Sequence, residues 1–396
     1  MLKGYDPKRF ASSDYITSQP KPKNDILATA SLRVIQNANR ATLIFLTSSL
    51  YQKLFHRQLK IAHSLGDGLY CIDLEKNIIT EEMITHLKHE ISEFISTHES
   101  LEIIDVPRAE LLKKFVENKR QDKVGILKTI STPEIKCVKC DEFLDYIIEP
   151  METNLKRLPI YTFQKYHNGF VLRLPTLLSP DSLQEWIEPK SQADMFDEYA
   201  EWAELVGVDN ISKLNEAIYQ KKVDDIKWVC EGLHQRKLAN LAIKLIEGYP
   251  SKRVITIAGP SSSNKTTFAK RLGIALQVNG YNSLVIEMDD YFLNREDTPF
   301  GPDGLRDFES IVALNVSLLS ERVHKLIQDQ SVPRRKFDFI EGIGYDIQEQ
   351  QQKLGDKCFL ILEGIHGLNP QLLKELGRDE VVPIYVAPLS PLSIDN

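Results

Sequence analysis

The chain has 396 residues, of which 42% are hydrophobic and 27% charged, and its formal net charge is −7. That length predicts two or three domains with a sizeable buried core. The acidic balance argues against a protein that coats nucleic acid. The sequence contains no run of about 18 apolar residues, so it predicts no membrane helix. The N-terminal segment lacks the apolar region of a secretory signal, and five scattered cysteines form no disulfide framework. We therefore expect a cytoplasmic protein without nucleic-acid or membrane partners.

The N-terminal half is predicted to be an α+β domain behind a short polar segment. Residues 1–25 are polar and punctuated by Lys and Pro, which predicts a mobile leader. Within residues 26–190, apolar side chains recur at helical spacing over Thr80–Thr97, and residues 169–175 have the pattern of a strand. Residues 191–250 are helical in pattern, so we expect a helical connector that packs on the following domain.

The residue pattern changes at residue 253, where short apolar runs begin to alternate with helical patterns. Four runs are almost wholly apolar: Arg253–Ala258, Ser283–Met288, Phe359–Leu362 and Val381–Val386. Strands of this kind are typical of a parallel sheet that is covered on both faces. Residues 251–396 are therefore predicted to form an α/β domain, a parallel sheet flanked by helices.

A phosphate-binding loop follows the first of these strands. It comprises Gly259, Pro260, Ser261, Ser262, Ser263, Asn264, Lys265, Thr266 and Thr267. A helix is predicted directly afterwards, which gives the strand–loop–helix context that a P-loop requires. Loop N–H groups would hold the phosphates, Lys265 would neutralise their charge, and the Thr266 hydroxyl would coordinate Mg²⁺. The sequence thus indicates a site for a nucleoside triphosphate.

The loop departs from the usual G-x-x-x-x-G-K-[ST] pattern at one position, where Asn264 replaces the second glycine. If that position needs a positive φ, asparagine is the least unfavourable replacement, at a cost of about 1 kcal/mol. Its side chain could still crowd the phosphates.

Carboxylates follow two of the predicted strands. Asp289 and Asp290 come after Ser283–Met288, and Glu363 directly follows the apolar run Phe359–Leu362. Ligands bind at the carboxyl edge of parallel sheets, so these groups are expected to face the P-loop. An aspartate there can accept the proton of an acceptor hydroxyl, and Glu363 can bind Mg²⁺.

Taken together, these segments resemble the uridine kinase and phosphoribulokinase family. The resemblance is carried by the following segments, in the family's order and spacing: Gly259–Thr267, Met288–Phe292, Asn294–Pro299, Asp307–Glu309, Phe337–Phe339 and Glu363–Pro370. The chain is most similar to long microbial nucleoside kinases, in which a region like the accessory domain of threonyl-tRNA synthetase precedes the kinase. Residues 63–71, 166–175 and 231–234 extend that likeness N-terminally.

The resemblance implies transfer of the γ-phosphoryl group of ATP, with Mg²⁺, to the 5′-hydroxyl of uridine or cytidine, a step of pyrimidine salvage. Asp289 matches the catalytic base, with Lys265 among the catalytic groups and Thr266 and Glu363 at the metal. Asp307 matches the acid that holds the ribose. Phe337 and Phe339 lie in the segment that lines the base pocket. The alternative interpretation is that both side chains simply pack in the core. By analogy with the family, a homo-oligomer is expected.

Two departures from the family leave other functions open. Gly342 stands where animal-type uridine kinases have a base-contacting histidine, and Gly344 where many long bacterial relatives have arginine. The family continues into an arginine-rich lid, whereas this sequence stops at Asn396, so we expect truncation there and at the start. The alternatives are a degenerate nucleotide-binding homologue with little turnover, and a kinase of another small hydroxylated metabolite, as in the phosphoribulokinase branch.

Other metal-binding and nucleophilic groups are assigned no chemistry from sequence. Cys137 and Cys140 form a lone C-x-x-C without a second Cys/His pair at zinc-finger spacing. His63, His86 and His89 lack the spacing of a hydrolytic editing site. His366 is interpreted as a turn histidine packed against its domain, with substrate contact as the alternative.

Overall fold

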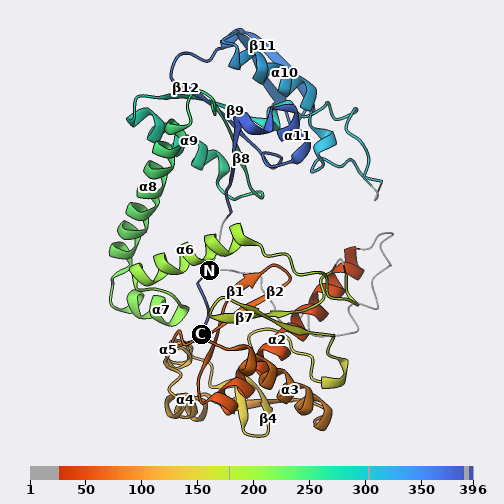
Figure 1. Ribbon diagram of the computed structural model, residues 1–396, viewed down its shortest axis with the longest axis vertical. Coiled ribbons are helices and arrows are strands. Elements are labelled where there is room, and N and C mark those ends of the chain that lie inside the picture. The colour runs from red at the N-terminus through yellow and green to blue at the C-terminus, as the bar shows by residue number, and fades with distance from the viewer. Residues whose placement is uncertain (1–25, 178, 302–303, 388–391, 396) are drawn as a thin grey trace. The chain divides into compact units, whose positions relative to one another are not determined.

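The computed structural model describes residues 26–177, 179–301, 304–387 and 392–395. The chain divides into two compact units (Figure 1). Unit 1 comprises residues 1–222 together with 391–396, and unit 2 comprises residues 223–390. The predicted leader, residues 1–25, lies outside the described part of the chain. Across the described residues, none of the helices combines the length and hydrophobicity that a membrane crossing requires.

Unit 1 contains a four-stranded antiparallel sheet in the order β1-β2-β7-β6. Its strands are β1 (Leu59–Leu65), β2 (Gly68–Asp73), β6 (Thr162–Tyr166) and β7 (Gly169–Arg173). All of β7 is buried, and it confirms the strand that was predicted at residues 169–175. Arg173 at its end forms two hydrogen bonds with the Asp67 carboxylate, at 2.6 and 2.8 Å, which neutralises this buried charge.

Two long helices, α2 (Ile26–Phe55) and α3 (Glu81–Thr97), supply much of the core of unit 1. The helix predicted over Thr80–Thr97 is α3, and Thr80 caps it by accepting a hydrogen bond from the N–H of Met83. The buried side chains of α3 follow helical spacing, as expected for one apolar face: Ile84, Leu87, Ile91 and Phe94.

The rest of unit 1 comprises a second sheet, in the order β3-β4-β5, and several shorter helices. Their bounds are β3 (Glu102–Pro107), α4 (Arg108–Glu117), α5 (Gln121–Thr129), β4 (Glu134–Cys140), β5 (Phe143–Tyr146), η2 (Leu155–Arg157), α6 (Lys190–Val206) and α7 (Ile211–Tyr219). The segment predicted as one helical connector is divided, because α6 and α7 belong to unit 1 and α8 (Val223–Glu247) to unit 2. The likeness of unit 1 to a synthetase domain stays a prediction.

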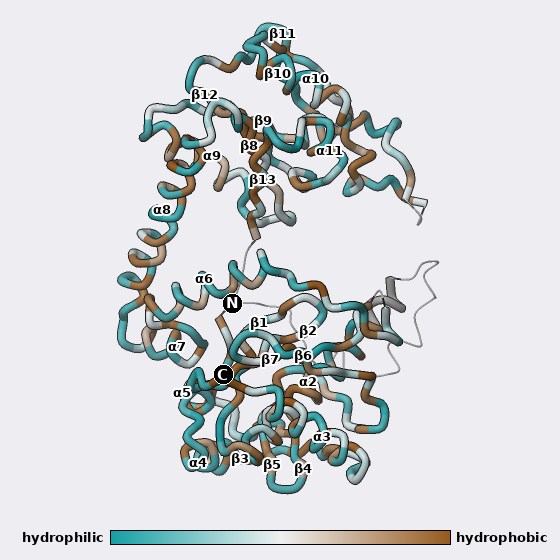
Figure 2. Tube along the Cα trace, viewed as in Figure 1, coloured by the Kyte–Doolittle hydropathy of each residue, from teal (hydrophilic) through white to brown (hydrophobic). Residues whose placement is uncertain are grey.

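Unit 2 is built on a four-stranded parallel sheet, as the sequence predicts. The strand order is β13-β8-β12-β9, with bounds β8 (Val254–Ala258), β9 (Asn282–Glu287), β12 (Cys358–Glu363) and β13 (Val381–Tyr385). The two central strands, β8 and β12, are buried along their whole length, and the sheet is correspondingly hydrophobic (Figure 2). Burial on both faces explains why these sequences are continuous apolar runs rather than alternating ones.

Helices cover both faces of this sheet (Figure 1). One face packs Ile255, Ile257 and Phe359 against α8 and α9 (Lys265–Val278). The other packs Leu360 and Leu362 against α10 (Val316–Ile327) and α11 (Pro370–Glu375). The remaining elements are η3 (Met288–Tyr291), η4 (Ile311–Ala313), η5 (Arg378–Glu380) and the hairpin of β10 (Val332–Asp338) and β11 (Ile343–Gln352). The sheet thus fixes the strand ends around which the candidate site is built.

Candidate active site

The predicted P-loop joins the carboxyl end of β8 to the N-terminus of α9. Gly259 is required there, because a Cβ atom at this position would collide with the carbonyl oxygen of Val386 and the Ser263 hydroxyl. Asn264 precedes α9, and its side chain forms no cap hydrogen bond. The first N–H groups of α9 therefore keep their capacity to bind an anion at the positive end of the helix.

Asn264 adopts the left-handed conformation, with φ 66° and ψ 29°. The replacement of glycine by asparagine is thus explained by backbone geometry, because asparagine tolerates this region better than other non-glycine residues. Its side chain is exposed rather than packed. Ser262, two residues earlier, also has a positive φ of 62°.

The end of β12 lies next to the start of α9. The Thr266 hydroxyl donates a hydrogen bond to the Glu363 carboxylate at 2.6 Å, while the Lys265 ammonium group contacts the carbonyl oxygen of Pro260 at 3.1 Å. Glu363 is only 6% exposed. Burial raises the pKa of its carboxyl group, and the hydrogen bond from Thr266 opposes that shift.

Asp289 lies in η3, directly after β9, which pairs with β12 on the side away from β8. Its side chain is open to solvent, as a group that meets a substrate must be. Displacement of water by the surrounding protein raises the pKa of Asp289, and the charge of Lys265 lowers it. The nearby carboxylate of Glu287 raises it further. Asp289, Lys265 and Glu363 thus share one electrostatic environment.

The second aspartate of the pair has a different environment. Asp290 is buried, and its carboxylate accepts hydrogen bonds from the Lys336 ammonium group at 2.8 Å and the backbone N–H of Phe337 at 3.2 Å. These bonds fasten β10 to η3. They place the hairpin that carries Phe337 and Phe339 beside Asp289.

The predicted aromatic pair lies on this hairpin. The rings of Phe337 and Phe339 meet edge to face with centroids 5.2 Å apart, and Phe337 also contacts Phe292. Phe339 is 60% exposed, so it is not a core residue. Exposed aromatic surface of this kind can stack on a planar ligand.

Two residues that sequence analysis left without a role hold the tip of this hairpin. Arg295 donates a hydrogen bond to the carbonyl oxygen of Phe339 at 2.7 Å, and its backbone N–H contacts the carbonyl oxygen of Gly342 at 2.7 Å. The side-chain oxygen of Asn294 accepts from the N–H of Gly344 at 3.1 Å. Their place in the Asn294–Pro299 segment was the available signal, but the sequence does not indicate what they contact.

Asp307 and His366 lie at the same side of unit 2. One Asp307 oxygen accepts the backbone N–H groups of Glu309 and Ser310, each at 3.0 Å, and so shapes the loop before η4. His366 is 8% exposed, as expected for a packed turn histidine. Burial lowers its pKa, while the charges of Asp289 and Asp307 act in the opposite direction. The histidine therefore lies within electrostatic range of both aspartates.

A comparison with known families decides the nature of this region. The sequence model described as the phosphoribulokinase / uridine kinase family matches residues 254–393. The C-terminal region is a domain of that family. The match suggests a phosphotransferase domain, and the family implies the use of ATP.

Individual proteins similar to part of this chain are described as uridine kinases or as a possible uridine kinase. The uridine kinases of Ligilactobacillus salivarius (strain UCC118) and Anoxybacillus flavithermus (strain DSM 21510 / WK1) are 27% and 28% identical over 123 residues. Each alignment covers 31% of this chain and 55% or 56% of the relative, so the chain spans about half the length of the curated relatives it matches. A solved structure described as a possible uridine kinase from Bacillus stearothermophilus aligns with a TM-score of 0.30 and 19% identity, covering 38% of this chain and 79% of that one.

The kinase domain contains oxygen groups that fit a divalent metal. The Glu363 carboxylate is buried, and none of the described residues forms an ion pair with it. Its hydrogen-bonded neighbour is the Thr266 hydroxyl, and carboxylate and hydroxyl oxygens are ligands that Mg²⁺ accepts. Thr266 and Glu363 are therefore the residues that would hold the ion.

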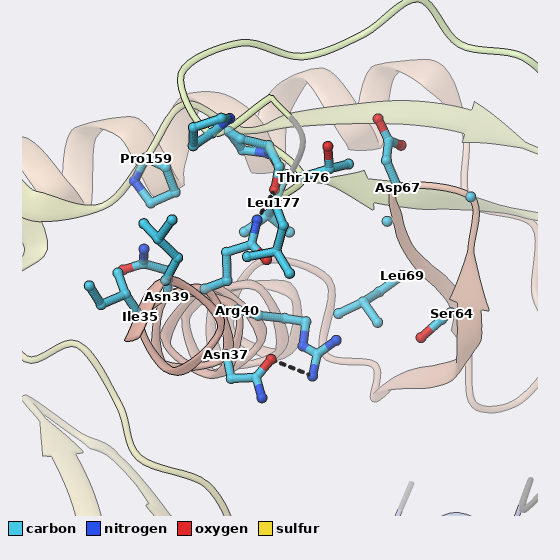
Figure 3. Close-up of a pocket in the computed structure, with 17 residues that line it drawn as sticks. Ile35, Asn37, Asn39, Arg40, Ser64, Asp67, Leu69, Pro159, Thr176 and Leu177 are labelled. Carbon is cyan, nitrogen blue, oxygen red and sulfur yellow. Dashed lines mark hydrogen bonds between the residues drawn. The ribbon is translucent and has the colours of Figure 1, made fainter. Parts of the chain in front are cut away.

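A separate hollow lies in unit 1, and none of the predicted site residues lines it. It has a volume of about 540 Å³ and is lined by residues of α2, of the β1–β2 hairpin and of the loops before β6 and after β7 (Figure 3). Some of its polar groups are paired within the protein, whereas the side-chain oxygen of Asn39 has no hydrogen-bond partner among the described residues. Arg40 contacts the side-chain oxygen of Asn37 at 3.3 Å, and Asp67 is bound by Arg173.

We predict that Glu363→Gln stabilises the protein at neutral pH. The pKa of Glu363 is higher in the folded protein than in the unfolded chain. Its contribution to the free energy of unfolding is therefore fully present below the unfolded pKa of about 4.3, and it is lost as pH rises through the folded pKa. Glutamine carries no charge, so its advantage should appear at neutral pH and shrink as pH approaches about 4.3. Chemical unfolding of both proteins across this range measures the difference. Equal stability at neutral pH would contradict the prediction.

We also predict that Asn264→Gly gives a more stable protein than Asn264→Ala, by about 1–2 kcal/mol. Alanine is sterically strained in the left-handed conformation of this position, whereas glycine is not. Asn279 at the other end of α9 is the matched control, since its φ is −95°. There the glycine variant should hold no advantage over alanine. Urea unfolding of the four variants tests this, and an alanine variant at 264 as stable as the glycine variant would refute it.

Proposed function

We propose that this chain transfers the γ-phosphoryl group of ATP to the 5′-hydroxyl of a pyrimidine nucleoside, converting uridine or cytidine to UMP or CMP. The observation that carries the proposal is the convergence of Lys265, Thr266, Glu363 and Asp289 at the carboxyl edge of one parallel sheet. The family match and the uridine kinase relatives support the same chemistry.

The P-loop is the proposed triphosphate site. The uncapped N-terminus of α9 would bind the phosphate oxygens, and Lys265 would exchange its contact with the Pro260 carbonyl for one with phosphate. Thr266 and Glu363 would hold Mg²⁺, which neutralises charge on the transferring group when it is bound. Fixed positive groups at this edge would lower the barrier electrostatically.

Asp289 is the proposed base. As the bond from the acceptor oxygen to the γ-phosphorus forms, the bond from that phosphorus to the β,γ-bridging oxygen breaks, and the acceptor's proton passes to the Asp289 carboxylate. A raised pKa suits this role, because it brings the proton affinity of the carboxylate closer to neutral pH. Solvent access to its side chain leaves room for the acceptor hydroxyl.

The acceptor is proposed to bind between η3 and the β10–β11 hairpin. Phe337 and Phe339 would stack on the base, and the Asp307 oxygen that is not used by the loop would accept hydrogen bonds from ribose hydroxyls. Asp290 would act indirectly, because its bonds to Lys336 and Phe337 position the hairpin.

Asp289→Asn should lower kcat by about 10²- to 10⁴-fold and leave the affinity for ATP nearly unchanged, because only proton acceptance is lost. In the parent, kcat/KM should fall as pH drops through the raised pKa of Asp289, above the ordinary aspartate value of about 3.9. The matched variant Asp290→Asn should instead raise KM for the nucleoside more than it lowers kcat. Steady-state kinetics of both variants would contradict the assignment if the two patterns were the same.

The identity of the acceptor is tested by transfer of labelled phosphate from ATP to a panel of nucleosides and sugar phosphates. Label on uridine and cytidine, but not on 5′-deoxyuridine, is the expected result, since the latter lacks the accepting hydroxyl. Transfer to a sugar phosphate would favour a phosphoribulokinase-like activity. Binding of ATP without transfer to any acceptor would identify a degenerate homologue. The substitution at Asn264 in the P-loop would then be a candidate cause of the lost activity.

A further inference from the structure

Three potential metal ligands meet at one corner of unit 1, far in sequence from the kinase domain. His98 directly follows α3, Cys140 ends β4, and Asp141 begins the turn to β5. The ligand atoms of the three side chains all lie within 4.8 Å of one another. We propose that His98, Cys140 and Asp141 bind a zinc ion that ties the end of α3 to the β4–β5 turn.

The hydrogen bonds of His98 fix which ring nitrogen faces this corner. Its Nδ1 atom lies 3.0 Å from the carbonyl oxygen of Phe94 and 3.0 Å from the Thr97 hydroxyl oxygen. The Thr97 hydroxyl already faces the carbonyl oxygens of Glu93 and Phe94, so it accepts from Nδ1 rather than donating to it. Nδ1 is therefore the protonated nitrogen of the neutral ring, as is usual for a metal-binding histidine.

The other nitrogen of His98 then presents a lone pair to a carboxylate. Nε2 lies 3.0 Å from Oδ2 of Asp141. Two acceptors at this distance repel each other unless a proton or a metal cation lies between them. The Phe94 ring stacks on the imidazole with centroids 4.0 Å apart and an interplanar angle of 12°, which holds the ring in this orientation.

Cys140 differs from the other buried cysteines. The thiols of Cys71, Cys137 and Cys358 each face a backbone carbonyl oxygen, at 3.4, 3.5 and 3.7 Å. Among the described residues, Cys140 has no such partner, although it is only 7% exposed. Burial raises the pKa of the Cys140 thiol, and the carboxylates of Asp141, Glu102 and Glu142 raise it further. A nearby dication would reverse that electrostatic effect.

The chemistry of the set selects zinc. Thiolate and imidazole are poor ligands for Mg²⁺ and Ca²⁺, whereas a tetrahedral Zn²⁺ ion accepts sulfur, nitrogen and oxygen together. Bonds of about 2.0–2.3 Å place tetrahedral ligand atoms about 3.4 Å apart, so a small closure of the present arrangement suffices. Water would take the fourth position. Binding replaces the S–H bond of Cys140 by a sulfur–zinc bond and releases that proton to solvent.

Cobalt substitution tests the site on the full chain. Chelator-treated protein should take up one equivalent of Co²⁺ and develop a thiolate-to-cobalt charge-transfer band, which Zn²⁺ should abolish. Cys140→Ser should lose the band. The matched variant Cys137→Ser, a buried cysteine three residues earlier on the same strand, should keep it, and so should Cys230→Ser, which removes an exposed thiol.

The half-exposed histidine provides a second variant in case Cys140→Ser does not fold. His98→Gln should weaken Co²⁺ binding by more than about tenfold, whereas His89→Ala, which alters an exposed His/Glu group on α3, should not. Zn²⁺ should raise the unfolding temperature of the parent and of Cys137→Ser. Absence of the band, its persistence in Cys140→Ser, or no effect of His98→Gln would overturn the proposal and leave a His98–Asp141 ion pair.

Discussion

The contact between the Thr266 hydroxyl and the Glu363 carboxylate joins the two strands on which the candidate active site depends. Thr266 lies in the first turn of α9, the helix after β8, and Glu363 is the last residue of β12. Because these strands are parallel neighbours, their carboxyl ends meet at one edge of the sheet. The next strand, β9, pairs in register with β12 up to Glu287, and so delivers Asp289 to that edge. Strand order, rather than proximity in sequence, assembles the site.

This assembly leaves the edge short of positive charge. The pKa values of both Glu363 and Asp289 are raised. The charge of Lys265 opposes the shift in each case, and His366 also opposes that of Asp289. Under the proposed function, one lysine that also contacts phosphate cannot neutralise two carboxylates and a polyphosphate. A divalent cation resolves this conflict, because it is attracted by the carboxylates and in turn attracts phosphate oxygens. Nucleotide and metal are therefore expected to bind this edge together.

The sequence predicted features that depend on local pattern. The buried strands of unit 2 were evident from their apolar runs, and the left-handed conformation at Asn264 from the requirement of the loop itself. The residue pattern alone did not separate Asp289 from Asp290, and it was the family resemblance that favoured Asp289. The structure distinguishes them physically, because Lys336 lies beside Asp290 alone. Likewise, Cys140 seemed to pair with Cys137 in a C-x-x-C motif. In the structure Cys137 faces a different core, and Cys140 lies beside His98 instead.

Two glycines of the hairpin, Gly342 and Gly344, stand where the family resemblance leads one to expect a histidine or an arginine. A Cβ atom at Gly342 would collide with the Arg295 side chain, and one at Gly344 with the guanidinium group of Arg335. The space beside each glycine is thus already filled from another segment. A histidine or an arginine at either position would displace a residue that now packs the hairpin. Gly342 also has a φ of 75°, a backbone conformation that is strained for residues with a side chain. Under the proposed function, recognition of the acceptor would therefore rest on the aromatic pair and on the backbone that Asn294, Arg295 and Asp290 hold in place.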